Sequence, residues 1–406
     1  MFNTGSETSN RPRTVSGVEQ ILNEGVMALK RDELGQENRV IRLSEDNAKL
    51  VEKFGAEQVG KLQQAPDFYT FRNGLMYSHR DFDVFYRKLL HGEKCAIVSG
   101  FNASGTPHMG HISVFDTNLF FQRKFGVKVF IPISDDESYV SGKVKTFEDG
   151  LRNSLALVRT MIAFGFDTFN TKIIIDQLYT DIYSLAMRLS RGINMSEIKA
   201  VYGYKPNQNV GLNFYPTVQA AHVLYPQSVG IPNVLVPIGP DEDAHLRVCR
   251  GLADKFGFVK PAVLHSVFMP GLDGQKMSKS KANAVFFLDS NNTIKRAVMS
   301  AFSGGRQSVE EHRKLGGNPE IDVALYYLRS YFLSQEESEA LTEDYRKGRV
   351  LSGELKQMLL ERLTVRVDEF REKLAKVTEK DMGRVILLKE DIDLHALIER
   401  LGVFKE

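Results

Sequence analysis

Short apolar runs alternate with longer helix-forming stretches through the middle of the chain. The runs are mostly rich in β-branched residues and bounded by turn-type or polar residues: Cys95–Val98, Val127–Ile133, Lys172–Ile175, Val234–Ile238 and Ala262–His265. The stretches between them include Ile112–Phe125, Phe147–Phe164 and Ala244–Phe256. Buried strands that alternate with helices predict an α/β fold with a parallel sheet. Ligands of such sheets bind at the carboxyl ends of the strands.

The pattern changes on both sides of this region. Residues 1–16 are polar, and we expect them to be disordered. Val18–Leu62 is charged with scattered apolar positions, which is typical of surface helices, and Asp67–Asp83 is rich in aromatics and is predicted to be irregular structure packed on a larger domain. The apolar runs end near Asn291, and Ser308–Glu406 consists mostly of helix formers with charged faces.

Four segments follow from this pattern. The last segment should contain helices over Ile321–Phe332, Gln335–Lys347 and Gly353–Val377. The predicted segments are a tail at 1–16, an N-terminal extension at 17–90 that packs on the next domain, an α/β domain with a helical insertion at 91–307, and a helical domain at 308–406.

Composition adds few constraints. The 406 residues are 42% hydrophobic and 26% charged, which is ordinary for a soluble globular protein. The net charge of +2 gives no global attraction to nucleic acid, so any RNA contact must come from a local patch. Cys95 and Cys249 have no metal-ligand spacing and are predicted to be reduced thiols. No stretch has the apolar length of a membrane helix and the N-terminus is not a secretory signal, so we expect a cytoplasmic protein.

Two histidines follow the first apolar run, in the segment Ser104–His111. His108 and His111 are three residues apart, so they share a face on the first turn of a helix. Both can donate hydrogen bonds to phosphate oxygens, and Gly110 between them allows a flat nucleobase or ribose to approach the backbone. A loop that opens a helix also favours anions. Ordinary surface histidines near a turn are the competing interpretation, and the strand-to-helix context favours the phosphate site.

A second polar motif, Asp273–Lys281, follows the run at Ala262–His265. Lys276 and Lys279 in it are flexible point charges suited to a triphosphate. Such a loop alone is most often solvated surface, but here both motifs lie at the end of a predicted strand. The chain has no Gly-x-x-x-x-Gly-Lys-Ser/Thr sequence, and no Gly-x-Gly-x-x-Gly follows the first strand, which excludes a P-loop and a dinucleotide-binding site.

The segments His108–His111 and Lys276–Ser280 resemble the two ATP-handling motifs of class I aminoacyl-tRNA synthetases. The resemblance narrows to the tryptophanyl-tRNA synthetases of the archaeal and eukaryotic type and spans roughly Leu50 to Lys380. The further segments that carry it are Gly74–Asp81, Ser134–Glu137, Phe214–Ala221, Ser303–Arg306, Glu311–Asn318 and Leu351–Lys356. It implies a Rossmann-like parallel-sheet catalytic domain followed by an α-helical anticodon-binding domain.

The resemblance implies a ligase that uses ATP with Mg²⁺ and charges tRNA through an aminoacyl-adenylate, with tryptophan as the amino acid. Positioning and charge stabilisation should carry the first step. Magnesium needs no dedicated protein cage, so no metal ligands are assigned. The resemblance implies that His108 and His111 bind the ATP phosphates and that Lys276 and Lys279 stabilise the charge of the departing pyrophosphate. It also implies that Glu137 and Gln219 bind the amino acid. Further ATP contacts are implied for Gly110, Met277, Ser278 and Ser280.

The chain departs from the family where the indole N–H is read. The family commonly uses a Tyr and a Gln at the positions of Val98 and Pro132, and neither side chain here accepts a hydrogen bond. A buried N–H without a partner costs about 1–3 kcal/mol. Three explanations are open: another residue accepts the bond, the alignment is displaced, or the substrate differs. Tyrosyl enzymes place an Asp where this chain has His222, which is either a new substrate contact or a surface histidine.

Two other functions compete with tryptophan–tRNA ligation. One is a tyrosine–tRNA ligase, and the other is an RNA-binding paralogue without ligase activity. The intact pairs of histidines and lysines argue against the paralogue, because a decayed copy has no reason to keep them. We expect the helical domain to bind the anticodon, with no residue assigned since Arg306, Arg313 and Lys314 are equally explained as solvated charges. A homodimer is expected from the family.

Overall fold

The computed structural model describes residues 51, 54–275, 277 and 283–404. The chain divides into two compact units, Met1–Gln36 and Glu37–Glu406. The first unit lies outside the described residues, as do the predicted tail at 1–16 and most of the predicted surface helices at Val18–Leu62. The description below therefore concerns the second unit.

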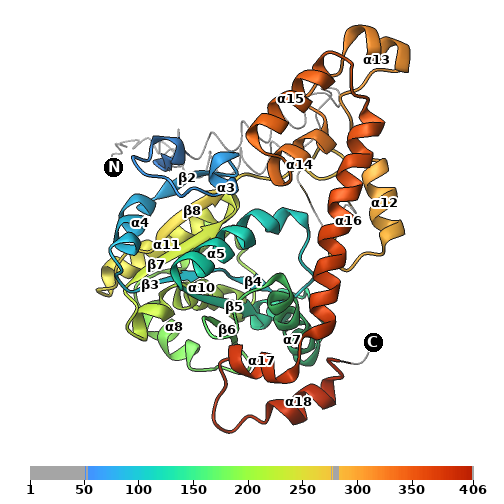
Figure 1. The fold of residues 1–406 in the computed structure, drawn as a ribbon. Coiled ribbons are helices and arrows are strands. Elements are labelled where there is room, and N and C mark those ends of the chain that lie inside the picture. Colours follow the sequence, from blue (N-terminus) through green and yellow to red (C-terminus); the bar gives the residue numbers. More distant parts are fainter. Residues whose placement is uncertain (1–50, 52–53, 276, 278–282, 405–406) are drawn as a thin grey trace, which may run out of the picture. The chain divides into compact units, whose positions relative to one another are not determined.

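A mixed sheet forms the centre of this unit (Figure 1). Its strands run in the order β1-β2-β8-β7-β3-β5-β4, with β6 paired to β5. The strands β3, β4, β5, β6, β7 and β8 pair in parallel, while β1 and β2 are antiparallel to their neighbours. The strand bounds are β1 Glu57–Gln58, β2 Met76–Arg80, β3 Cys95–Val98, β4 Phe101–Asn102, β5 Lys128–Ser134, β6 Thr171–Ile175, β7 Asn233–Ile238 and β8 Ala262–Ser266.

Helices cover both faces of the sheet, so the strands are buried on both sides. Side chains alternate along a strand: Ile97 belongs to one apolar core, whereas Ala96 and Val98 belong to the other. The first core is built with α4, α5 and α7, and the second with α8, α10 and α11. Their bounds are α4 Phe82–Leu90, α5 Ile112–Phe125, α7 Phe147–Phe164, α8 Ile182–Ser190, α10 Val210–Ser228 and α11 Asp243–Lys255.

The five apolar runs are all strands, and the predicted helices between them are α5, α7 and α11. The predicted Rossmann-like α/β class is confirmed. Cys95 and Cys249 are free and buried, as expected. Short elements connect the larger ones: η2 Val59–Lys61, α3 Tyr69–Arg72, η3 Met109–His111, α6 Asp135–Val140, α9 Met195–Tyr202 and η4 Pro240–Glu242.

The prediction of irregular structure for Asp67–Asp83 is wrong. This segment contains α3 and then β2, which pairs with β8 in the central sheet. Its strand lacks an apolar run, because polar side chains find buried partners instead: Ser78 bonds Nδ1 of His265 at 3.0 Å, and Arg80 pairs with Asp243 at 2.7 Å. Upstream of it, Val51 and Phe54 are helical, as expected for this region, and are followed by β1 and η2.

Helices follow the last strand, as predicted. The long α16 packs against α7, α12 and α14. The final helices then return to the sheet edge, where the amide of Leu387 donates to the carbonyl of Ile173 at 2.9 Å (Figure 1). The bounds are α12 Asn291–Met299, α13 Val309–Leu315, α14 Val323–Tyr331, α15 Gln335–Arg346, α16 Ser352–Lys376, α17 Glu379–Val385 and α18 Leu394–Leu401. Within the described parts of the chain, no helix has the length and apolar character needed to cross a membrane.

Candidate active site

Most of the described residues that the sequence singles out follow the carboxyl ends of parallel strands. His108 and His111 come after β3 and β4, Glu137 lies in α6 directly after β5, and Met277 comes after β8. Gln219 is contributed by α10, which covers the same part of the sheet through Ala220, Ala221 and their neighbours. Open parallel sheets bind ligands at this edge.

The two histidines of the first motif lie side by side at the start of α5. Their ring centroids are 4.0 Å apart, so the prediction of a shared face is confirmed. Backbone amides fix both rings: the amide of Gly110 donates to Nδ1 of His108 at 3.2 Å, and the amide of His108 donates to Nδ1 of His111 at 3.1 Å. Phe101 packs against His111 with centroids 4.9 Å apart.

The second motif approaches the first at Gly110. A Cβ on Gly110 would lie 3.2 Å from Sδ of Met277, so glycine is what permits this close approach. The chain after the motif is also held there, because the amide of Met109 donates to the carbonyl of Val285 at 3.0 Å. Lys276, Ser278, Lys279 and Ser280 lie outside the described residues.

The ends of the second-motif loop are joined to each other. The amide of Leu272 donates to the carbonyl of Asn283 at 2.8 Å, and the side-chain amide of Asn283 donates to Asp273 at 2.9 Å. Both ends of the loop therefore start from a fixed base beside the histidines.

A cavity of about 380 Å³ opens next to Phe101, on the side of the sheet that α10 covers. It is lined by Val98, Pro132, Glu137 and Gln219, which the family resemblance placed in the amino-acid pocket. His222, for which a substrate contact and a surface position were both open, lines it too. Val98 and Pro132 line the cavity, and neither side chain offers a hydrogen-bond acceptor. Its other walls include Tyr202, Tyr204, Tyr215, Val223, Val236 and Leu246.

Glu137 provides a carboxylate on the wall of this cavity, and it is buried. Nζ of Lys143 lies 2.8 Å and 2.9 Å from its two oxygens, and the side-chain amide of Asn102 also donates to it. The Lys143 side chain is 46% exposed, so this ion pair contributes little stability and exchanges readily. Glu137 thus already binds one ammonium group in this structure.

Gln219 belongs to a hydrogen-bonded chain along another wall. Its Oε1 accepts from the hydroxyl of Tyr202 at 3.0 Å, and its Nε2 donates to Glu242 at 3.3 Å. Burial alone would raise the pKa of Glu242, but the bonds to His245 and Gln219 outweigh burial and lower it. Glu242 therefore keeps a negative charge at neutral pH.

His222 is buried, so its interpretation as a surface histidine is wrong. Its Nε2 lies 2.6 Å from Oδ1 of Asp176, which follows β6 and is fully buried. Asp135 and Asp136 complete a compact acidic cluster around Asp176. Asp135 accepts bonds from the amide of Asp176 and from Gln177, so this cluster is an internal hydrogen-bonded network.

The sequence missed Asp176, Glu242, Lys143, Tyr202 and Asn102. Asp176 and Glu242 carried a usable signal, since each follows the carboxyl end of an apolar strand. Lys143 and Tyr202 had none, because they reach the cavity from loops and short helices whose path the sequence pattern does not predict.

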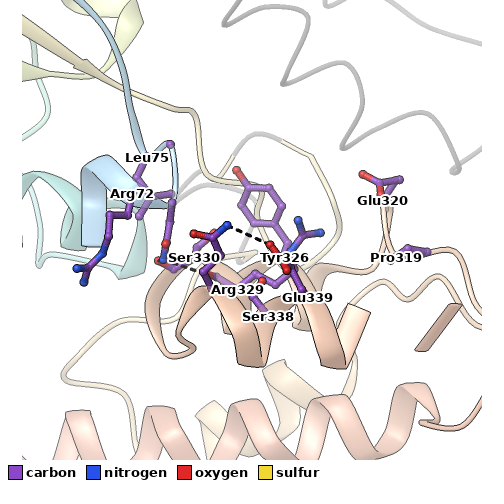
Figure 2. A pocket seen from close by; sticks show the side chains of 12 residues that line it. Arg72, Leu75, Pro319, Glu320, Tyr326, Arg329, Ser330, Ser338 and Glu339 are labelled. Atoms are coloured by element: carbon purple, nitrogen blue, oxygen red, sulfur yellow. Dashed lines mark hydrogen bonds between the residues drawn. The ribbon is translucent and has the colours of Figure 1, made fainter. Parts of the chain in front are cut away.

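A second hollow, of about 420 Å³, contains none of the predicted site residues (Figure 2). It lies where the turn after α3 meets α14 and α15. The side-chain amide of Asn73 bridges to α14, where it donates to the carbonyls of Arg329 at 3.1 Å and Ser330 at 3.2 Å. This hollow therefore lies at the packing interface between the segment after α3 and the helices α14 and α15.

Arg306 and Arg313 are exposed, as solvated charges would be, and each also donates to a backbone carbonyl. Arg306 donates to the carbonyl of Gly316 at 2.9 Å, and Arg313 donates to that of Gly348 at 3.0 Å. Both thus brace the turns around α13, and no anticodon role is assigned to them.

Comparison with known proteins agrees with this geometry. The family model described as tRNA synthetases class I (W and Y) matches residues 90–367. The chain is 33% identical to a tryptophan–tRNA ligase of Sulfolobus acidocaldarius over 361 residues, which cover 86% of this chain and 93% of that protein. It is 41% identical to tryptophan–tRNA ligase 2 of Halobacterium salinarum over 330 residues, which cover 79% of this chain and 84% of that protein.

Solved structures give the same grouping. The tryptophanyl-tRNA synthetase of the archaeon Aeropyrum pernix K1 superposes with a TM-score of 0.78 at 29% identity, covering 88% of this chain and all of that one. The Plasmodium falciparum enzyme of the same name gives 0.75 at 29% identity, covering 83% of this chain and 94% of that one. This chain belongs to the class I tRNA synthetases of the tryptophan and tyrosine group.

Proposed function

We propose that this chain is a tryptophan–tRNA ligase, which activates tryptophan with ATP and then charges tRNA(Trp). The observation that carries the proposal is the convergence of His108, His111 and Met277 beside a cavity with a buried carboxylate and apolar walls. The 33–41% identity to tryptophan–tRNA ligases supports tryptophan over tyrosine.

The histidine pair binds the phosphates of ATP. The amide of Gly110 donates to Nδ1 of His108, so a neutral His108 ring carries its hydrogen on Nε2 and can donate it to a phosphate oxygen. Nδ1 of His111 lies within bonding distance of both the amide and the carbonyl of His108, so either ring nitrogen of His111 can carry its hydrogen. Lys276 and Lys279 supply positive charge to the departing pyrophosphate, with Ser278 and Ser280 as further ATP contacts. Mg²⁺ accompanies the triphosphate and neutralises part of its charge, and it needs no dedicated protein carboxylates for this.

The amino acid binds in the cavity with its ammonium group on Glu137. There it replaces Nζ of Lys143, which has solvent to move into because its side chain is 46% exposed. The carboxylate then lies towards Phe101 and His111, on the side of the phosphates.

The reaction is an in-line displacement at the α-phosphate. A carboxylate oxygen forms the new bond to phosphorus, and the bond to the pyrophosphate oxygen breaks, which gives the aminoacyl-adenylate. The adenylate then passes its acyl group to a hydroxyl of the terminal adenosine of tRNA and releases AMP. The residues above act by positioning the two substrates and by stabilising charge.

Three further expectations belong to this proposal. The helices from α13 onwards bind the anticodon, two copies of the chain form a homodimer, and the enzyme works in the cytoplasm. These rest on the family alone.

ATP–pyrophosphate exchange with each of the standard amino acids tests the proposal. We expect exchange with tryptophan and, in a second assay, charging of tRNA(Trp). His108→Asn and His111→Asn should each lower exchange strongly, while the exposed His395→Gln in α18 should not. Exchange with tyrosine alone would establish the tyrosine ligase instead, and no exchange with any amino acid would leave the non-ligase paralogue.

A further inference from the structure

The cavity needs a hydrogen-bond acceptor for its substrate, and Val98 and Pro132, where the family commonly has a Tyr and a Gln, cannot provide it. The inference below rests on the proposed function, in which the substrate is tryptophan. Its indole N–H is a donor, and a buried donor needs an acceptor. Val98 and Pro132 line the cavity and offer none.

Most polar groups on the walls are already engaged. Glu137 holds Lys143, and Oε1 of Gln219 accepts from Tyr202. Ser134 and Tyr215 bond each other through their hydroxyls at 2.8 Å. These groups either serve the ammonium end of the substrate or satisfy one another.

His222 lines the cavity as well, and only one of its two ring nitrogens, Nε2, has a hydrogen-bond partner among the described residues. The ring lines the cavity, and Nε2 is held by Oδ1 of Asp176 at 2.6 Å. Nδ1 makes no hydrogen bond within the described part of the chain. We propose that Nδ1 of His222 accepts the hydrogen bond of the indole N–H and thereby selects tryptophan, with Asp176 as the positioning residue.

The proton positions in the acidic cluster support this role. The groups that face His222 and Asp176 are Asp135, Asp136 and Tyr183. Burial, followed by the charge of Asp176, raises the pKa of Asp136 to about 8, so Asp136 keeps its proton at neutral pH. That proton can serve Oδ2 of Asp176, which is buried and otherwise without a partner among the described residues.

Burial and the charge of Asp135 also raise the pKa of Asp176 well above its usual range, against the opposing effect of the bond with Asp136. Asp176 is an acceptor for His222 when the proton between the two carboxyl groups lies on Asp136. Nε2 of His222 then carries the hydrogen of the neutral ring and donates it to Asp176. Burial also lowers the pKa of His222 to about 4, so the ring stays neutral and Nδ1 keeps its lone pair.

An analogue without the N–H isolates this single bond. In β-(3-benzothienyl)alanine a sulfur replaces the indole N–H within a similar bicycle, so the shape is kept and the donor is lost. The quantity to measure is the ratio of kcat/KM for tryptophan to that for the analogue in ATP–pyrophosphate exchange. Because both substrates meet the same folded enzyme, any loss of folded protein cancels in this ratio.

His222→Gln is the matched variant, since a glutamine amide can replace Nε2 as the donor to Asp176 but offers nothing in place of Nδ1. We expect the ratio to fall roughly fivefold to tenfold, the value of one neutral hydrogen bond. His222→Asn places an amide near Nδ1 and should retain part of the preference. Tyr204→Phe removes a hydroxyl from another part of the cavity wall and should keep the ratio.

Each outcome decides between the alternatives. A wild-type ratio in His222→Gln, or its loss in Tyr204→Phe, would overturn the role of His222. If the wild-type enzyme itself prefers the analogue to tryptophan, the role of His222 is also overturned, because Nδ1 would then carry a hydrogen. Absence of tryptophan exchange in the wild type would instead refute the proposed function, which keeps the two failures distinguishable.

Discussion

Gly110→Ala is the most direct probe of the meeting point between the two motifs. A Cβ at this position would lie 3.0 Å from Cε1 of His108, 3.1 Å from its Nδ1 and 3.2 Å from Sδ of Met277. Ordinary contacts of a Cβ lie between 3.4 and 4 Å, so both neighbours must move by a few tenths of an ångström. Overpacking of this kind costs about 1–3 kcal/mol.

The cost should appear in the handling of ATP. His108 cannot move without disturbing its bond from the amide of Gly110, whereas the flexible Met277 can give way. We therefore expect the lower part of the range, a fall of about tenfold in kcat/KM for ATP. The KM for the amino acid should change much less, because the cavity begins beyond Phe101.

Steady-state ATP–pyrophosphate exchange at saturating tryptophan measures the effect. Gly251→Ala is the matched control: it lies in α11, where an added Cβ meets no atom within 4 Å. It should leave ATP kinetics unchanged and add up to about 1 kcal/mol of stability from helix propensity. Wild-type ATP kinetics in Gly110→Ala would refute the idea that the two motifs close around ATP at this point.

Three further predictions concern charge. Glu137→Gln keeps the shape of the side chain but removes its charge, so the KM for tryptophan in exchange should rise by about tenfold or more, and an unchanged KM would place the ammonium elsewhere. Burial alone would raise the pKa of Asp243, but His265 and Arg80 outweigh it and hold that pKa well below its usual range. The stability that Asp243 contributes is therefore present above its unfolded pKa of about 4 and is lost as the pH falls. The urea midpoints of the wild type and of Asp243→Asn should converge from about pH 5 downwards. A difference between them that stays constant with pH would contradict the assignment. Arg366 contacts both oxygens of a largely buried Asp116 at 2.7 Å. Arg366→Met should therefore lower the free energy of unfolding, measured by thermal denaturation, by about 2 kcal/mol, and adding Asp116→Asn should restore part of it. An unchanged Tm in Arg366→Met would contradict a stabilising role for this ion pair.

The sequence predicted those parts of the fold that local pattern determines. Each apolar run became a strand because a parallel strand buried on both faces must be apolar throughout, and the histidine pair followed from spacing on one helical turn. The strand β2 was missed because its polar residues are satisfied by partners far along the chain, such as Asp243 for Arg80. No local pattern carries that information.

The candidate site divides in the same way. Val98, Pro132 and Glu137 were placed in the pocket by their resemblance to family positions, and they lie together because the carboxyl ends of β3 and β5 meet at one edge of the sheet. The burial of His222 could not be predicted, since it depends on Asp176, a residue 46 positions earlier that is brought next to α10 by the order of the strands. Tertiary pairing of polar groups decides such positions, and it is set by topology.

The antiparallel strand β2 has a practical consequence for any shortened version of this enzyme. Residues 90–367, which match the family model, omit β2 and begin at the last residue of α4. A chain cut at residue 90 would leave the far side of β8 as an open row of backbone donors and acceptors, with His265 and Asp243 deprived of Ser78 and Arg80. Such an edge is a template for strand pairing between molecules, so the truncated protein should self-associate. The smallest well-behaved catalytic fragment therefore has to start ahead of β2.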